Sequence, residues 1–296
     1  MRTILTGIDF SPESELAVEH ALALARRLGC TVTLAVATFL PDLPEGLSPS
    51  MMASYQRFSA DLGSRLQSER ARLEELRQRY VGQGVELSHV ILDGRPEDAL
   101  PQAAKDLNAL AVVVGSHGRT GLRRIAMGSV AEKIVRVEER PVLVARGPAP
   151  RGGYQRVVVG LDFAPAAKKA LLAARDCLAP GGSLELLHCW QLPLWSYAGG
   201  APMISDNVAQ FRQDMLADLQ RTGERWLSET GSIDGSVSFH VLERPASVGL
   251  DDWARERKAD LIVVGSHGYR GLQRWLIGSV AEATVRHAHT SVLVVH

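Results

Sequence analysis

The chain has 296 residues, and its 33 basic and 33 acidic side chains leave a formal net charge of zero. This length fits two domains of about 150 residues each. The balanced charge excludes a global basic field that would draw the chain to nucleic acid or to a membrane surface.

Membrane insertion and secretion are not expected either. No apolar stretch approaches the roughly 18 residues that a membrane span needs, and the apolar run at the N-terminus is too short for a signal peptide. The three cysteines, Cys30, Cys177 and Cys189, are scattered and odd in number. They indicate reduced thiols in a cytoplasmic protein and argue against a disulfide framework or a metal site.

In chain order, the first half predicts strands that alternate with helices. The predicted elements are a strand over 3–9, a helix over 14–28, a strand over 31–37, a loop over 41–54, a helix over about 59–81, a strand over 86–92, a helix beginning near Pro96, a strand over 109–114, a helix near 129 and a strand over 142–145. Prolines suit the first turn of a helix, and Pro, Gly, Ser and Met dominate the predicted loop.

The second half repeats this order after a linker over 147–153 that is rich in Gly and Pro. The predicted elements are a strand over 156–162, a helix over 166–178, a strand over 183–189, a loop over 192–207, a helix over 207–230, a strand over 236–242, a helix beginning near Pro245, a strand over 260–264, a last helix and a strand over 292–295. Such alternation predicts two tandem α/β domains, 1–146 and 154–296, each a doubly wound parallel sheet covered by helices on both faces.

One motif occurs twice, 150 residues apart: G-S-H-G, nine residues, then G-S, beginning at Gly115 and again at Gly265. From Gly115 to Lys133, twelve of nineteen positions match the second copy. Each copy follows an apolar strand and precedes a helix. Backbone N–H groups and the helix dipole at such a junction form a cradle for anions, so the motif predicts a phosphate-binding loop in each half.

Within the motif, Gly118 and Gly268 can adopt positive φ and let a phosphate approach the backbone, because they have no Cβ. Gly128 and Gly278 stand just before the helix, with Ser129 and Ser279 at the expected N-caps. A purely structural interpretation remains open here, because each serine begins an S-x-x-E capping box with Glu132 or Glu282. Capping alone does not explain three glycines kept in register twice.

The nine-residue insert carries arginines in both copies, and these could neutralise terminal phosphates or simply face solvent. They are Arg119, Arg123 and Arg124 in the first copy, and Arg270 and Arg274 in the second. His117 and His267 could contact phosphate. A metal role is not expected for them, because no second ligand lies at a suitable spacing.

Asp9 and Asp162 end the first strand of each half. A carboxylate at this place can accept hydrogen bonds from ribose hydroxyls, as acidic residues do in dinucleotide-binding folds. The alternative is an aspartate that caps the following helix. Because Asp9, Asp162 and both glycine loops follow strands of a parallel sheet, they are predicted to meet at its carboxyl edge, where ligands bind.

Taken together, the element order, the terminal Asp, the Gly94-Arg95-Pro96 turn and the G-x₂-G-x₉-G-S motif followed by V-A-E resemble the universal stress protein family. The resemblance covers both halves, so the chain looks like a tandem member. In that family the motif marks the ATP-binding branch. The resemblance implies the strand order 3-2-1-4-5 and the pairing of two modules through their last strands, here as an internal pseudo-dimer with a homodimer as a further option.

The resemblance also assigns roles to positions of this sequence. Asp9 and Asp162 match the ribose-binding aspartate, and Val36 and His188 fall near the position whose backbone faces adenine. Matching the phosphate loops are Gly115, Gly118, Arg119, Gly128, Ser129, Gly265, Gly268, Gly278 and Ser279. The second half departs from the pattern twice, with Ala164 where the first half has Ser11 and Glu243 where it has Gly94.

No catalytic constellation is legible in the chain. It has no G-x-x-x-x-G-K-[ST] loop and no G-x-G-x-x-G after its first strand, and the motif offers neither a lysine nor paired metal carboxylates for phosphoryl transfer. The sequence therefore predicts a cytoplasmic stress-response sensor or regulator that binds ATP, AMP or ADP, with Mg²⁺ as a candidate companion ion. A slow ATPase or self-phosphorylating protein and a scaffold with purely structural loops are the alternatives.

Overall fold

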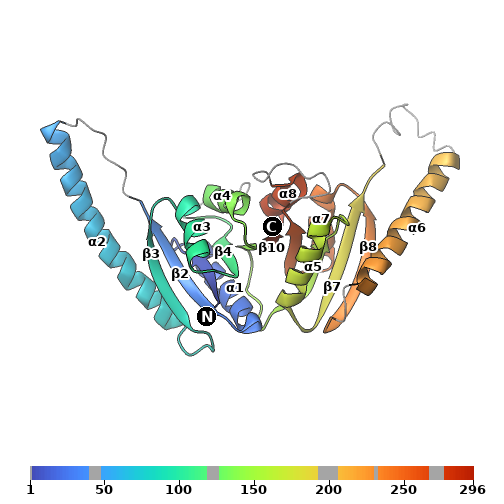
Figure 1. Cartoon of the computed structure of the whole chain (residues 1–296), viewed down its shortest axis with the longest axis horizontal. Helices are drawn as coiled ribbons and strands as arrows, with labels where there is room; N and C mark the ends of the chain where they lie inside the picture. The colour runs from blue at the N-terminus through green and yellow to red at the C-terminus, as the bar shows by residue number, and fades with distance from the viewer. Residues whose placement is uncertain (1, 40–47, 119–126, 193–205, 230–232, 267–276) are drawn as a thin grey trace. The chain divides into compact units, whose positions relative to one another are not determined.

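The computed structural model describes residues 2–39, 48–118, 127–192, 206–229, 233–266 and 277–296 (Figure 1). The chain divides into two compact units, residues 1–149 and 150–296. Each unit is an α/β domain built on a five-stranded parallel sheet, which confirms the predicted fold class.

The first domain places its strands in the order β3-β2-β1-β4-β5. The strands are β1 (Thr3–Gly7), β2 (Thr31–Thr38), β3 (Leu87–Asp93), β4 (Ala111–Gly115) and β5 (Val142–Ala145), and the helices are α1 (Pro12–Leu28), α2 (Pro49–Arg79), α3 (Pro96–Asp106) and α4 (Ser129–Val137). The chain winds outward from β1 to β3 and then returns past β1 to β4. Its winding therefore reverses between β1 and β4, which is where open α/β sheets bind ligands.

The second domain repeats the order as β8-β7-β6-β9-β10. Its strands are β6 (Tyr154–Gly160), β7 (Leu178–Trp190), β8 (Gly235–Glu243), β9 (Leu261–Gly265) and β10 (Ser291–Val295), and its helices are α5 (Pro165–Cys177), α6 (Asp206–Glu229), α7 (Ala246–Glu256) and α8 (Ser279–His287). The order 3-2-1-4-5 that the resemblance implied is thus present in both domains.

Helix α1 shows how local chemistry sets the elements that flank the site. Ser11 caps the helix, because its Oγ accepts a hydrogen bond from the Ser14 N–H at 3.2 Å, and Pro12 follows in the first turn. Gly29, with φ of 61°, ends the helix in the left-handed conformation. Small buried side chains, Ala17 and Ala21 among them, let the helix lie close to β4.

Helix α2 differs from the prediction at its beginning. It starts at Pro49 and not near residue 59, so residues 49–54 are helical although the sequence favoured a loop. The reason is a local start signal: the Ser48 Oγ accepts from the Met51 N–H at 3.3 Å, and Pro49 occupies the first turn. The remainder of that predicted loop, 41–47, and residues 193–205 of the second loop lie outside the described residues.

The C-terminal end of α2 packs the helix against the sheet. Leu73 and Leu76 are fully buried, and the helix contacts β2 and β3 at this end, whereas its N-terminal turns extend away from the strands (Figure 1). Among the described residues, no helix combines the length and apolar character that crossing a membrane requires.

Candidate functional site

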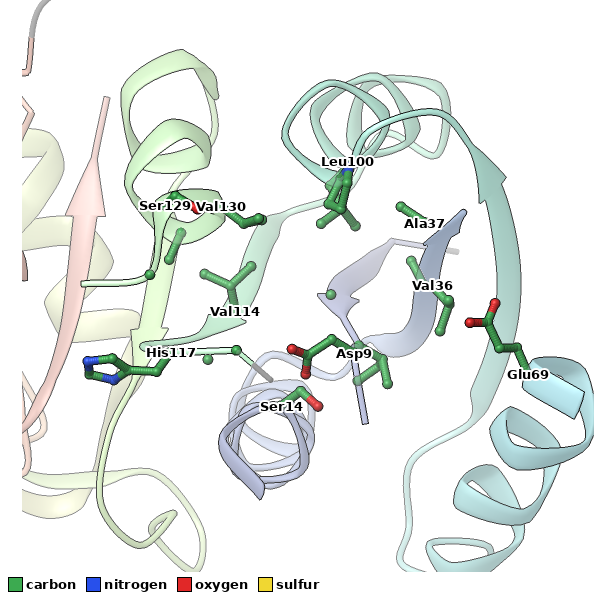
Figure 2. A pocket seen from close by; sticks show the side chains of 18 residues that line it. Asp9, Ser14, Val36, Ala37, Glu69, Leu100, Val114, His117, Ser129 and Val130 are labelled. Atoms are coloured by element: carbon green, nitrogen blue, oxygen red, sulfur yellow. The ribbon is translucent and has the colours of Figure 1, made fainter. Parts of the chain in front are cut away.

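A cavity of about 380 Å³ opens in the first domain where β1, β2 and β4 end (Figure 2). Its walls come from the β1–α1 turn, the end of β2, the loop after β4 and the first turn of α4, with further contributions from α2 and α3. It lies at the point where the winding reverses, and its size is that of a small-molecule site.

Asp9 stands near the centre of this cavity, directly after β1 (Figure 2). Its Oδ1 accepts two hydrogen bonds from Ser11, one from the backbone N–H at 3.0 Å and one from the hydroxyl at 2.5 Å. Since Ser11 also caps α1, the carboxylate is oriented by the helix start and is not itself the cap. This arrangement removes the simple capping interpretation of Asp9.

The residue after Asp9 adopts an unusual backbone conformation. Phe10 has φ of 61°, and its counterpart Phe163 has φ of 60°. A bulky residue in the left-handed region costs about 1–3 kcal/mol and persists only where its surroundings hold it. In the first domain the Arg72 guanidinium lies 4.0 Å from the centroid of the Phe10 ring. The repeated Asp-Phe-x-Pro sequence was the available signal for this turn, and the sequence analysis missed it.

The spacing of the glycine motif has a structural explanation. The Gly128 N–H donates to the Ser116 carbonyl at 2.9 Å, so the residues on the two sides of the nine-residue insert are held together. The second domain repeats the closure, because the Gly278 N–H donates to the Ser266 carbonyl at 2.7 Å. The closure brings Gly118 and Gly128 to the same cavity wall.

Two glycines of this loop are needed for steric reasons. At Gly118 a Cβ would lie 2.7 Å from the Asp9 Oδ2, and at Gly115 it would lie 2.8 Å from the Glu13 carbonyl of α1. Gly118 does not use the positive φ that a glycine permits. Its missing side chain makes room for the carboxylate of Asp9, whereas Gly115 lets α1 pack against β4.

The start of α4 corrects a second expectation. Gly128 is the N-cap and Ser129 is the first helical residue, so the predicted capping box does not form. The Glu132 carboxylate instead pairs with Arg136 at 3.1 Å. Helix α8 begins in the same way at Gly278. A glycine cap supplies no side-chain acceptor for the N–H groups of the first helical turn. These N–H groups can therefore donate to an external anion.

The opposite end of the cavity is largely apolar. Val36, which is 3% exposed, lines it together with Ala37, Leu100 and Val114. One carboxylate reaches this end from α2: the Glu69 Oε2 accepts from the Thr38 hydroxyl at 2.9 Å. Glu69 is remote in sequence from every motif residue, and nothing in the sequence analysis singled it out.

His117 lines the cavity, but its ring points away from Asp9 (Figure 2). Its Nδ1 lies 3.0 Å from the Ser116 Oγ. The arginines of the first insert, Arg119, Arg123 and Arg124, fall outside the described residues, as do His267, Gly268, Arg270 and Arg274 of the second copy.

The turn after the first strand recurs in the second domain, where the residue two positions after the aspartate donates one hydrogen bond to it and not two. The Asp162 Oδ1 accepts from the Ala164 N–H at 3.0 Å, and α5 has no side-chain cap because Ala164 lacks a hydroxyl. The His188 Nδ1–H donates to the Leu161 carbonyl at 2.8 Å, and its ring packs against Phe163 with centroids 4.7 Å apart. Burial lowers the pKa of His188.

The turn before the third helix also differs between the domains. Gly94 has φ of 116°, and its N–H donates to the Thr38 carbonyl at 2.9 Å. Glu243, at the corresponding place, ends β8 and pairs with Arg212 at 2.5 Å. The two domains therefore differ in conformation and in contacts at this turn.

The universal stress protein family model matches residues 1–146 and 153–296, nearly the whole chain in two consecutive copies. The chain therefore belongs to the universal stress protein family. A universal stress protein of Mycolicibacterium smegmatis is 29% identical over 308 residues, which cover 99% of this chain and 96% of the relative. A universal stress protein of Mycobacterium tuberculosis is 37% identical over 186 residues, which cover 62% of this chain and 60% of the relative.

Solved structures agree at the level of the fold. The crystal structure of a universal stress protein from Archaeoglobus fulgidus covers 99% of this chain and 95% of its own, with a TM-score of 0.66 and 20% sequence identity. At this identity the likeness concerns the fold alone.

In the first domain of this universal stress protein, six of the predicted binding residues line one cavity: Asp9, Val36, Gly115, Gly118, Gly128 and Ser129. In the second domain, the described members of the predicted set are Asp162, His188, Gly265, Gly278 and Ser279. Asp162 and Gly265 follow or end strands at the carboxyl edge of that sheet, and Gly278 caps α8 as Gly128 caps α4.

Proposed function

We propose that the first domain of this universal stress protein binds an adenine nucleotide. One observation carries the proposal: a single cavity joins an oriented carboxylate, a glycine-capped helix start and an apolar wall. These are the three chemistries that a nucleotide presents, because its ribose offers hydroxyl donors, its phosphates carry negative charge and its base is flat and largely apolar.

Each part of the ligand has a suitable place along the cavity. Asp9 would accept from the ribose hydroxyls, since Ser11 already holds its carboxylate in position. The phosphates would lie at Gly118 and the first turn of α4, where backbone N–H groups and the helix dipole favour anions. The base would lie between Val36 and Leu100. If the ligand is ATP, Mg²⁺ would be held mainly by phosphate oxygens and water, as that ion prefers.

The geometry favours binding over turnover. The described residues that line the cavity include no lysine and no arginine, and the Asp9 and Glu69 carboxylates both accept hydrogen bonds from neighbouring protein groups. The site thus offers groups that can bind the charged parts of a ligand. Groups that could catalyse phosphoryl transfer are less evident among its described residues. We infer a regulatory role in the stress response, in which bound nucleotide shifts the population of conformations by its differential affinity for them.

The second domain is proposed to bind nucleotide more weakly. It retains Asp162, the closure at Gly278 and the glycine cap of α8. It lacks the hydroxyl that orients the aspartate in the first domain, because Ala164 replaces Ser11. A carboxylate that is less firmly held loses more conformational freedom when it binds a ligand.

Two measurements test this function. Mass spectrometry of the small molecules released from purified, denatured protein identifies any retained ligand. Calorimetry with ATP, ADP and AMP then compares the full chain with Asp9→Ala and Gly118→Val, each of which should remove one binding equivalent. Asp106→Asn, an exposed change at the end of α3, serves as the control and should leave binding intact. Unchanged stoichiometry in both site variants would refute the assignment.

A further inference from the structure

Glu69 enters the cavity from a helix that contributes none of the motif residues. Figure 2 shows its side chain reaching from α2 toward Val36, at the apolar end of the cavity. Its Oε2 is held by the Thr38 hydroxyl at 2.9 Å, and Thr38 ends the strand that also carries Val36. The carboxylate is therefore positioned beside the region assigned to the base.

We propose that Glu69 is a specificity-determining residue that reads the edge of the base. The Glu69 Oε2 accepts a hydrogen bond from the Thr38 hydroxyl, and the Oε1 would accept one from the exocyclic amino group of adenine. A base with a carbonyl oxygen at that position, such as hypoxanthine, would place an acceptor against the carboxylate and be rejected. This inference rests on the proposed nucleotide-binding function and deepens it, because it names the feature of the ligand that the first domain selects.

The end of the second strand differs in the second domain. Thr38 lies three residues after the partner of Gly7 in the β1–β2 register, and Trp190 lies three residues after the partner of Gly160 in the β6–β7 register. The second domain therefore has Trp190 where the first has Thr38, so the hydroxyl that holds Glu69 has no counterpart there. The second domain is expected to discriminate less between amino and carbonyl purines.

The test compares ATP with inosine triphosphate, whose base carries a carbonyl oxygen in place of the amino group. Titrations use the full chain carrying Asp162→Ala, which weakens binding in the second domain. We expect ATP to bind about 10- to 100-fold more tightly than inosine triphosphate, the range of one hydrogen bond to a charged group.

The decisive variant is Glu69→Gln. The Thr38 hydroxyl would still donate to the side-chain oxygen of the glutamine. The glutamine N–H₂ group would then face the base and donate to the carbonyl oxygen of hypoxanthine. The ratio of the affinity for ATP to the affinity for inosine triphosphate should then fall to about one or reverse. Thr38→Val, which removes the hydroxyl that orients Glu69, should reduce the discrimination while ATP still binds. Glu75→Gln, an exposed change on the same helix, is the matched control.

The outcomes separate the two proposals. If Glu69→Gln or Thr38→Val folds, as judged by far-UV circular dichroism, and both nucleotides bind with the ratio of the parent, Glu69 does not read the base. If ATP binds but Asp9→Ala and Gly118→Val leave its affinity unchanged, the proposed site itself is wrong. Absence of binding to the parent chain overturns both proposals.

Discussion

Gly118→Ala probes the contact between the glycine loop and the Asp9 carboxylate. A Cβ at this position would lie 2.7 Å from the Asp9 Oδ2, well inside ordinary van der Waals separation. Since the backbone of Gly118 is not in the left-handed region, alanine introduces no φ strain. The cost must therefore arise from displacing Asp9, whose Oδ1 accepts two hydrogen bonds from Ser11.

The expected magnitude follows from these contacts. Inserting a methyl group into a packed site costs about 1–3 kcal/mol, and disturbing hydrogen bonds to a charged group adds about 1.5–3 kcal/mol each. We expect Gly118→Ala to destabilise the first domain by about 1–3 kcal/mol, because the Asp9 carboxylate lies at the end of a side chain that can rotate and recover part of the loss. When Asp9→Ala has already removed the carboxylate, the same substitution should be neutral or stabilise by about 0.5 kcal/mol.

A double-mutant cycle isolates this coupling. All five tryptophans lie in the second half, at 190, 195, 226, 253 and 275. Tryptophan fluorescence therefore reports unfolding of the second domain only, and urea unfolding of the first must be followed by hydrogen exchange of β1 and β4. Gly63→Ala, an exposed glycine of α2 with open space at its Cβ position, is the control and should not destabilise. An equal cost of Gly118→Ala with and without Asp9 would refute the reasoning.

Three further predictions concern the caps, a histidine and the domain pairing. Ala164→Ser should rebuild the missing cap of α5 and stabilise the second domain by about 0.5–1 kcal/mol, seen as a higher urea midpoint by tryptophan fluorescence; an unchanged midpoint would show that the hydroxyl does not reach the helix. Because burial lowers the pKa of His188, the unfolded chain binds a proton more readily, so this group costs stability as the pH falls below about 6.5. His188→Asn should reduce the loss of second-domain stability between pH 8 and pH 5.5, and an identical pH profile would argue against it. Residues 1–146 expressed alone should self-associate in sedimentation, because an apolar last strand such as Val142–Ala145 invites pairing, and a strictly monomeric fragment would contradict the proposed pseudo-dimer.

The sequence by itself determined the architecture and the edge of the sheet that carries the candidate site. Apolar runs such as Val157–Val159 predict buried parallel strands, and their alternation with helical segments predicts the doubly wound fold. The repeated motif and the terminal aspartates could be located because these signals are local: they depend on spacing along the chain and on the ends of strands.

Several details were decided only by the tertiary structure. Ser129 and Glu132 form a plausible capping box in sequence, yet the closure from Gly128 to Ser116 starts the helix one residue earlier and makes the glycine its cap. Gly118 suggested a positive φ, but its missing side chain is required by the nearby Asp9 carboxylate.

Glu69 shows the same limit most clearly. On a polar helix it is one charged residue among many, and it joins the site only because α2 crosses beside the end of β2, where Thr38 holds it. Contacts between segments distant in the chain depend on how helices pack on the sheet. Local periodicity predicts which face of a helix is buried but not which side chain at its margin reaches a cavity.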